Sequence, residues 1–195
     1  MSTLRSKTTV TSEKQRAMRQ RFAACAKFLN PIRQLCNTAY GSRRRSGKLS
    51  GVNGVMSHML TNAFPENSTS INILYQYVRL SKGRLTLPIV KALTMEDNKM
   101  QVFWSYCPYE LASGNDSAVL LVYSQEKQIF LVNLDQSKRK HGKAEVNIPP
   151  EFRHDTLHTY LFFQSSDRKE ASNTLYLPPV GQQEEHTETA LRMRY

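Results

Sequence analysis

The chain has 195 residues, of which 39% are hydrophobic, and a formal net charge of +11. This length suits one domain or two small ones, and no stretch approaches the roughly 18 consecutive apolar residues that a membrane helix needs. Residues 1–10 are polar and basic and lack the apolar core of a secretory signal. We therefore expect a cytoplasmic protein that does not contact a membrane.

The positive charge is concentrated in the first half of the chain. Residues 1–90 hold 15 Lys and Arg against 2 Asp and Glu, which makes +13. Residues 91–195 hold 12 against 14, which makes −2 and accounts for the total. This asymmetry indicates that the first half meets an anionic partner.

A first helix is predicted after a flexible basic lead over residues 1–11. Ser12 and Gln15 have the spacing of a capping box, in which the Ser side chain accepts a free backbone amide and the Gln side chain reaches back. The apolar residues that follow recur at helical spacing and predict the buried face: Met18, Phe22, Cys25 and Leu29.

Asn30-Pro31 predicts a fresh helix start, because Asn caps well and Pro suits the first helical position. Gly41 can end this second helix. The two segments also fit one helix kinked at Pro31. A third helix is predicted after the basic loop 41–50, from an apolar stripe that Pro65 stops: Val52, Val55, Met56, Met59, Leu60 and Phe64.

From Ile71 the apolar period changes to two, which predicts a strand over 71–77. Seven further short strands separated by turn residues predict a β-sandwich of the immunoglobulin or fibronectin type III class. Their expected ranges are 89–93, 100–106, 118–124, 128–133, 144–148, 157–163 and 171–177.

Two aromatic residues sharpen this interpretation. Trp104 shares the inward parity of Val102 in the second sandwich strand, a place that Trp commonly takes in fibronectin-type modules. Tyr160 follows Ile148-Pro149-Pro150 at the distance of a tyrosine whose hydroxyl ties down the corner before the sixth strand. An ordinary core aromatic explains Tyr160 equally well.

The expected fold class is therefore α+β, with basic N-terminal helices followed by an immunoglobulin/fibronectin-type-III-like sandwich. Residues 12–86 are expected to form the helical segment with a β extension, and 87–180 the sandwich. Residues 181–195 are charged and almost free of apolar side chains, so we expect a disordered tail.

Several short stretches together resemble a family of about this size, widespread in Bacteroidota and known as a domain of unknown function. They are Gln15–Phe22, Phe28–Arg33, Gly51–His58, Tyr77–Gly83, Leu120–Tyr123 and Ala171–Leu177. The chain departs from that family at its start, where a longer Gly-rich basic segment with a Trp is usual. The resemblance implies a fold and carries no activity.

Residues for catalysis or metal binding are scarce. Cys25, Cys36 and Cys107 form no C-x-x-C pair, and we expect small buried side chains rather than a disulfide framework. His154 and His158 lack an obvious third metal ligand, and no phosphate-binding loop or nucleophile elbow occurs. We expect no enzyme activity, metal or cofactor.

The basic first half is the best functional lead, because Arg suits bidentate contact with phosphate oxygens and acidic residues are nearly missing around it. We expect contact with nucleic acid or another polyanion, although charged side chains are also ordinary on the solvent faces of amphipathic helices. The candidate residues are Arg16, Arg19, Arg21, Lys27, Arg33, Arg43, Arg44, Arg45 and Lys48. The alternative is a structural or assembly module of a larger particle, acting through protein contacts at the sandwich edges.

Overall fold

The computed structural model describes residues 12–40, 50–66, 69–107 and 113–179, with the side chains of 134–136 left out. The expected lead 1–11 and tail 181–195 lie outside these ranges. Three helices come first in the chain: α1 (Glu13–Leu29), α2 (Arg33–Ala39) and α3 (Gly51–Asn62). A 3-10 turn at Asn30–Ile32 joins α1 to α2. Asn30 does not cap a new helix, because its backbone is helical and no side-chain cap bond starts either segment, so the structure fits the alternative of one helix interrupted at Pro31.

The capping box at the start of α1 is confirmed. The Gln15 amide donates to the Ser12 hydroxyl and the Ser12 amide donates to the Gln15 side chain, both at 3.3 Å. This local exchange satisfies two amides that have no partner within the helix.

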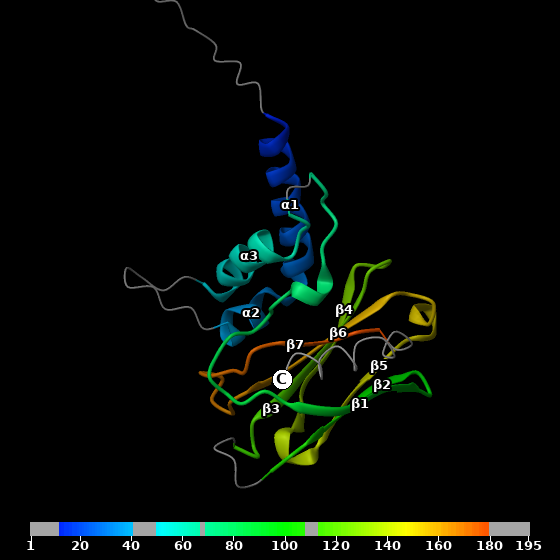
Figure 1. The fold of residues 1–195 in the computed structure, drawn as a ribbon. Helices are drawn as coiled ribbons and strands as arrows, with labels where there is room; N and C mark the ends of the chain where they lie inside the picture. Colours follow the sequence, from blue (N-terminus) through cyan, green and yellow to red (C-terminus); the bar gives the residue numbers. More distant parts are fainter. Residues whose placement is uncertain (1–11, 41–49, 67–68, 108–112, 180–195) are drawn as a thin grey trace, which may run out of the picture.

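The predicted buried face of α1 is half wrong. Cys25 and Leu29 are buried, but Met18 and Phe22 are 51% and 53% exposed. The first turns of α1 extend beyond the sheet that its last turns cover (Figure 1), so these two side chains have no sheet to pack on.

The seven sandwich strands are confirmed. They are β1 (Ile89–Glu96), β2 (Lys99–Ser105), β3 (Ser117–Ser124), β4 (Ile129–Lys138), β5 (Lys143–Asn147), β6 (Leu157–Gln164) and β7 (Leu175–Leu177). They form two antiparallel sheets in the orders β1-β2-β5 and β4-β3-β6-β7. The last strand is shorter than expected, because residues 171–172 make only isolated bridges.

Turn chemistry explains where β1 ends. Asp97 and Asn98 both have positive φ, 48° and 60°, and they connect β1 to β2 in a two-residue turn. Asp and Asn tolerate this backbone region better than most residues, so these two residues suit the turn between the strands.

The sandwich core lies between the two sheets and contains Trp104 and Val102, as their shared parity predicted. Trp104 donates its indole N–H to the Arg139 carbonyl at 2.8 Å. Its ring meets Phe163 edge-on, with centroids 5.4 Å apart. A buried indole thus keeps both its packing and its hydrogen bond.

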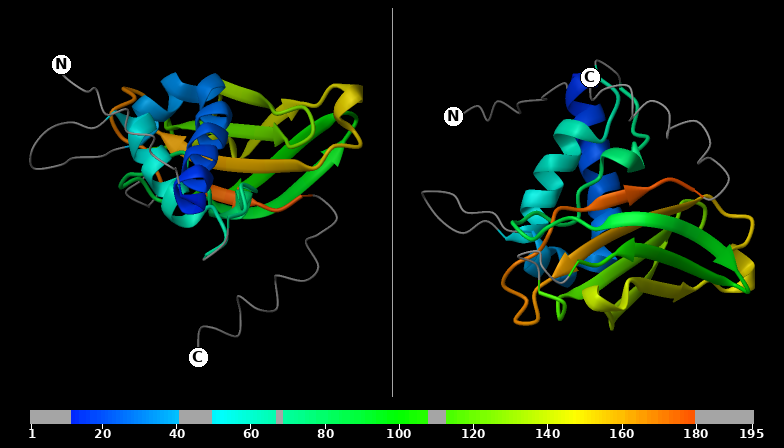
Figure 2. Two further views of the ribbon diagram at one scale, coloured as in Figure 1. Left: turned by 90° about the horizontal axis from the view of Figure 1, so that it is seen from above. Right: turned by 60° about the horizontal axis from the view of Figure 1, so that its bottom comes forward.

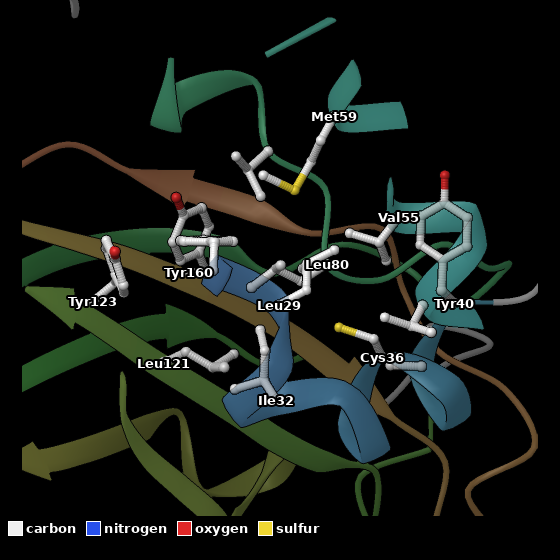
Figure 3. Packing of buried hydrophobic residues seen from close by; sticks show 14 of the residues in the cluster. Leu29, Ile32, Cys36, Tyr40, Val55, Met59, Leu80, Leu121, Tyr123 and Tyr160 are labelled. Atoms are coloured by element: carbon white, nitrogen blue, oxygen red, sulfur yellow. The ribbon is translucent and has the colours of Figure 1, made fainter. Parts of the chain in front are cut away.

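A second core lies on the outer face of the four-stranded sheet, beneath the helices (Figures 2 and 3). Leu29 and Met59 from the helices meet Leu121 and Tyr160 from the sheet. All eight residues of β3 and all eight of β6 are buried, because these central strands are covered on both faces. The molecule therefore has three layers: helices, a four-stranded sheet and a three-stranded sheet.

The predicted strand over residues 71–77 is wrong. This segment has no strand partner and includes a 3-10 turn at Tyr75–Tyr77. It runs between α1 and the sheet, and Ile73 and Tyr75 pack on the helix-side core. An extended segment with one side against a core shows the same period of two as a strand.

The corner role predicted for Tyr160 is also wrong. Its hydroxyl donates to the Tyr75 carbonyl at 3.0 Å, which ties the 71–77 segment to β6. The side chain points toward the helices because β6 alternates its side chains between two cores.

Candidate polyanion-binding surface

The cations that the sequence singled out lie at separate places on the helices. Arg16, Arg19 and Lys27 are exposed on α1, and Arg33 is exposed at the start of α2. Arg43, Arg44, Arg45 and Lys48 lie outside the described residues. The described members span about 16 Å along α1 alone, at about 1.5 Å per residue, and thus form no compact cluster.

Arg21 has a structural role. Its guanidinium donates to the Ser70 carbonyl at 2.9 Å and to the Pro65 carbonyl at 3.3 Å. It also lies over the Phe64 ring, 4.9 Å from the centroid. Arg21 therefore fixes the segment after α3 against α1 instead of facing a partner.

A compact basic site occurs where α2 meets the turn between β6 and β7. There a hollow of about 440 Å³ is lined by Lys82, Arg84 and Lys169, and Glu170 is the one acidic side chain among its described lining residues. We call these three cations and the space between them the basic hollow. Each cation is exposed.

The backbone of residues 81–85 fixes the basic hollow. Lys82 donates its amide to the Ala39 carbonyl at 3.0 Å, and Leu85 donates to the Ala171 carbonyl at 3.1 Å. The Ser81 amide donates to the Thr174 hydroxyl at 2.7 Å. The segment is thus held between the end of α2 and the start of the last hairpin, with its charged side chains outward.

Gly83 makes this close packing possible. A Cβ at this position would lie 2.1 Å from the Ala171 carbonyl oxygen, far inside contact distance. Any side chain would push the 81–85 segment away from residue 171 and widen the hollow. The glycine therefore serves close approach between two backbones.

Neighbouring carboxylates compensate only part of the positive charge of this region. The ion pairs Lys99–Glu145, Lys127–Asp155, Arg139–Asp116, Lys143–Glu145 and Lys169–Asp167 lie in the sandwich. Lys169 belongs to one of them, an exposed pair with Asp167. For Arg79, Lys82 and Arg84 the described part of the chain offers no ion-pair partner.

The field of these cations reaches the neighbouring helix. The pKa of His58 in α3 is lowered by burial first and then by the positive charges of Arg79 and Lys82. A neutral His58 leaves the anion-attracting charge to the Arg and Lys side chains.

Sequence reasoning missed the basic hollow because Lys82 and Lys169 are 87 positions apart. The stretch Tyr77–Gly83 was recognised only as part of a family pattern. Gly83 at the end of this stretch, together with Arg84 directly after it, was the one local signal that the segment is tightly packed and basic.

Two further findings concern all of the described residues. Among described residues, no three His, Cys, Asp or Glu side chains gather closely enough to hold a metal ion. None of the described helices is long and apolar enough to cross a membrane.

Comparison with known proteins places the chain in a group without an assigned role. A family model described as a family of unknown function, DUF6266, matches residues 2–178. No curated protein matches the chain.

Proposed function

The chain belongs to the DUF6266 family, and we propose that it is a non-enzymatic protein that binds nucleic acid or another polyanion through its basic helical half. The basic hollow is the observation that carries this proposal. Three exposed cations there line one concavity, with Glu170 in its lining and Asp167 paired to Lys169. The proposal places the protein in the cytoplasm, where nucleic acid is available.

The chemistry of the hollow suits phosphate groups. Arg84 can contact two phosphate oxygens at once, and Lys82 and Lys169 add compact point charges. Such contacts neutralise phosphates without reading sequence, so we expect affinity with little base preference at this site.

The cations predicted from the sequence extend the same proposal. Arg16, Arg19 and Arg33 add exposed positive charge on the helices. Arg43, Arg44, Arg45 and Lys48 follow Tyr40, whose backbone is bridged to Lys82. We treat this group as a separate contributor and test it separately.

The test is fluorescence anisotropy with a labelled 20-nucleotide single strand and a duplex of equal length, across a salt series. The triple variant Lys82→Ala/Arg84→Ala/Lys169→Ala removes the cations of the basic hollow. Because each phosphate contact contributes about 0.7–0.9 to the slope of log K against log salt, we expect the slope to become shallower by roughly 2. An Arg43→Ala/Arg44→Ala/Arg45→Ala variant tests the group predicted from the sequence.

The matched control is Lys91→Ala/Lys140→Ala/Arg153→Ala, which removes the same charge from exposed positions of the sandwich. It should leave the slope close to that of the unchanged protein. If the triple variant of the basic hollow and the control changed the slope equally, the effect would be explained by net charge alone. Failure to bind at low salt would reject the proposal.

The second candidate function is a structural or assembly module. The edge strand β1 favours it, because Ile89 is 64% exposed there and Leu87 just before it is 42% exposed. Apolar side chains on an open edge suit strand pairing with a partner. This function predicts concentration-dependent oligomers that persist in 0.5 M salt, measured by sedimentation velocity, whereas polyanion complexes dissociate under those conditions.

A further inference from the structure

A groove runs between β4 and β5, each of which is an edge strand of its sheet. The two strands lie side by side, but no backbone hydrogen bond joins 130–133 of β4 to 145–147 of β5. Two hollows, of about 350 Å³ and about 330 Å³, lie along this line and share Asn133 and Glu145 as lining residues. We call the two hollows together the β4–β5 groove.

The walls of the groove are the backbone edges of the two strands. One hollow is lined by the consecutive residues 130–133 and 145–147. Because alternate side chains of a strand point to opposite faces, consecutive lining residues mean that the strand edges themselves border the hollow. Residues 130–132 are half-buried although their side chains pack on the cores at either face of the sheet, so this edge is open. Backbone N–H and C=O groups on the free side of each strand therefore have no strand partner.

The buried side chain of Asn133 has unused hydrogen-bonding capacity. It is 3% exposed and lies two positions after Leu131, on the side of β4 that faces the sandwich core. Neither its Oδ1 nor its Nδ2 has a hydrogen-bond partner among the described residues. A buried amide without partners costs stability, so its presence calls for an explanation. Both hollows are lined by Asn133, and a ligand in the groove therefore lies next to it.

The rim of the groove offers donors to an anionic group. His141 is exposed, and its Nδ1 accepts from the Lys138 amide at 3.1 Å, so Nε2 carries the proton of the neutral ring. Lys143 is also exposed. Glu145 already pairs with Lys99 and Lys143, at 3.2 Å each. With two lysines to this one carboxylate, the rim keeps a positive charge.

We propose that the β4–β5 groove binds an extended peptide segment of a partner protein, with an acidic side chain on the segment. The peptide backbone pairs with the free edge of β4 as an added strand. One of its peptide groups exchanges hydrogen bonds with the Asn133 amide, and its carboxylate meets His141 and Lys143. This site is separate from the basic hollow and does not depend on the proposed function.

A peptide matches the unpaired groups of the groove better than a nucleic-acid backbone does. The free edge of a strand alternates donors and acceptors at the spacing of another strand. The Asn133 amide also needs both an acceptor and a donor, which every peptide group provides. A phosphodiester provides acceptors alone, so it would leave the Asn133 Oδ1 without a partner.

The test is an NMR titration with a capped peptide that alternates Val and Thr around one central Glu. Backbone pairing tolerates many sequences, so this strand-forming peptide is a suitable probe. We expect the backbone amide signals of 130–133 and 145–147 to shift. The same peptide with its backbone amides N-methylated cannot donate to a strand edge and should bind at least about tenfold more weakly.

Two variants separate binding from stability. Asn133→Leu keeps the size of the side chain and removes the unpartnered amide, so we expect the melting temperature to rise by roughly 3 °C and peptide affinity to fall about tenfold. Lys143→Ala should weaken binding about fivefold. Lys91→Ala is the matched control, because it removes the same charge from an exposed position of β1 and should leave affinity unchanged.

Each contrary outcome overturns the proposal. These outcomes are the absence of amide shifts at millimolar peptide, or equal affinity of the N-methylated peptide. Shifts confined to 89–95 would assign the peptide to the β1 edge instead. If Asn133→Leu is more stable yet binds with full affinity, the amide has no part in recognition. If the 20-nucleotide single strand shifts 130–133 and 145–147 while the peptide does not, the groove belongs to nucleic-acid binding.

Discussion

Arg139 is a buried cation whose contacts join three parts of the sandwich. Its guanidinium lies 3.2 Å from the Asp116 carboxylate and 3.7 Å from the centroid of the Phe163 ring. It also donates to the Thr86 carbonyl just before β1. Both members of the ion pair are at least 95% buried, so neither is screened by water.

Asp116→Ala is predicted to destabilise the protein by about 3–5 kcal/mol, because it leaves the Arg139 charge buried without its carboxylate. Urea unfolding measures the loss. Asp167→Ala is the control, since it breaks the exposed pair with Lys169 and should cost less than about 1 kcal/mol. Equal losses in the two variants would contradict a structural role for the buried pair.

His158 makes stability depend on pH. Burial lowers its pKa from 6.5 to about 4. The unfolded chain therefore takes up a proton at higher pH than the folded chain does, and stability is lost as pH falls from about 6.5 to about 4. At about 1.4 kcal/mol per pKa unit, the loss attributable to His158 is on the order of 3 kcal/mol.

Urea unfolding at pH 7.0 and at pH 4.5 measures this dependence. In His158→Gln the difference between the two pH values should shrink, because the titrating group is gone. An unchanged difference would assign the acid sensitivity to carboxylates instead.

At the scale of elements, one hydrogen bond holds the 71–77 segment to the sheet. Tyr160→Phe removes the hydroxyl that donates to the Tyr75 carbonyl and leaves that carbonyl without this partner. We predict a loss of about 1 kcal/mol and faster amide exchange in this segment. Tyr77→Phe, at a side chain that is 53% exposed, should change neither quantity.

The strands and the 71–77 segment also show how far a local sequence pattern predicts secondary structure. The strand ranges could be predicted from the sequence because turn residues separate the apolar runs, as Asp97 and Asn98 do after the first strand. The 71–77 segment was misassigned because its alternation came from contact with a core rather than from strand pairing. The continuous apolar run of β3 indicates a strand covered on both faces, but it could not reveal that helices form the second cover.

At the scale of the whole molecule, the helices complete the sandwich. Without residues 1–86, the sheet would expose the apolar side chains that now form the helix-side core, among them Leu121, Tyr160 and Phe162. We predict that a fragment spanning 87–179 binds a hydrophobic dye and unfolds without cooperativity.

The same fragment with Val119→Thr, Leu121→Thr and Phe162→Thr should unfold more cooperatively and bind less dye, because its outer face is then less apolar. A cooperative transition in the unsubstituted fragment would show that the helices are dispensable for folding.

The sequence by itself determined the features that depend on neighbours along the chain. The capping box at Ser12 and the break at Asn30-Pro31 are set by interactions within a few residues, and the seven sandwich strands could be located from their apolar runs and the turn residues between them. The positive charge of the first half is likewise a property of composition.

Only the tertiary structure decided which of these residues come together. It exposed Met18 and Phe22, engaged Arg21 in backbone hydrogen bonds and placed Lys82 and Lys169 around one hollow. Such outcomes depend on packing between distant segments, whose geometry no local spacing encodes. The basic hollow exists because the end of α2 lies against the turn between β6 and β7.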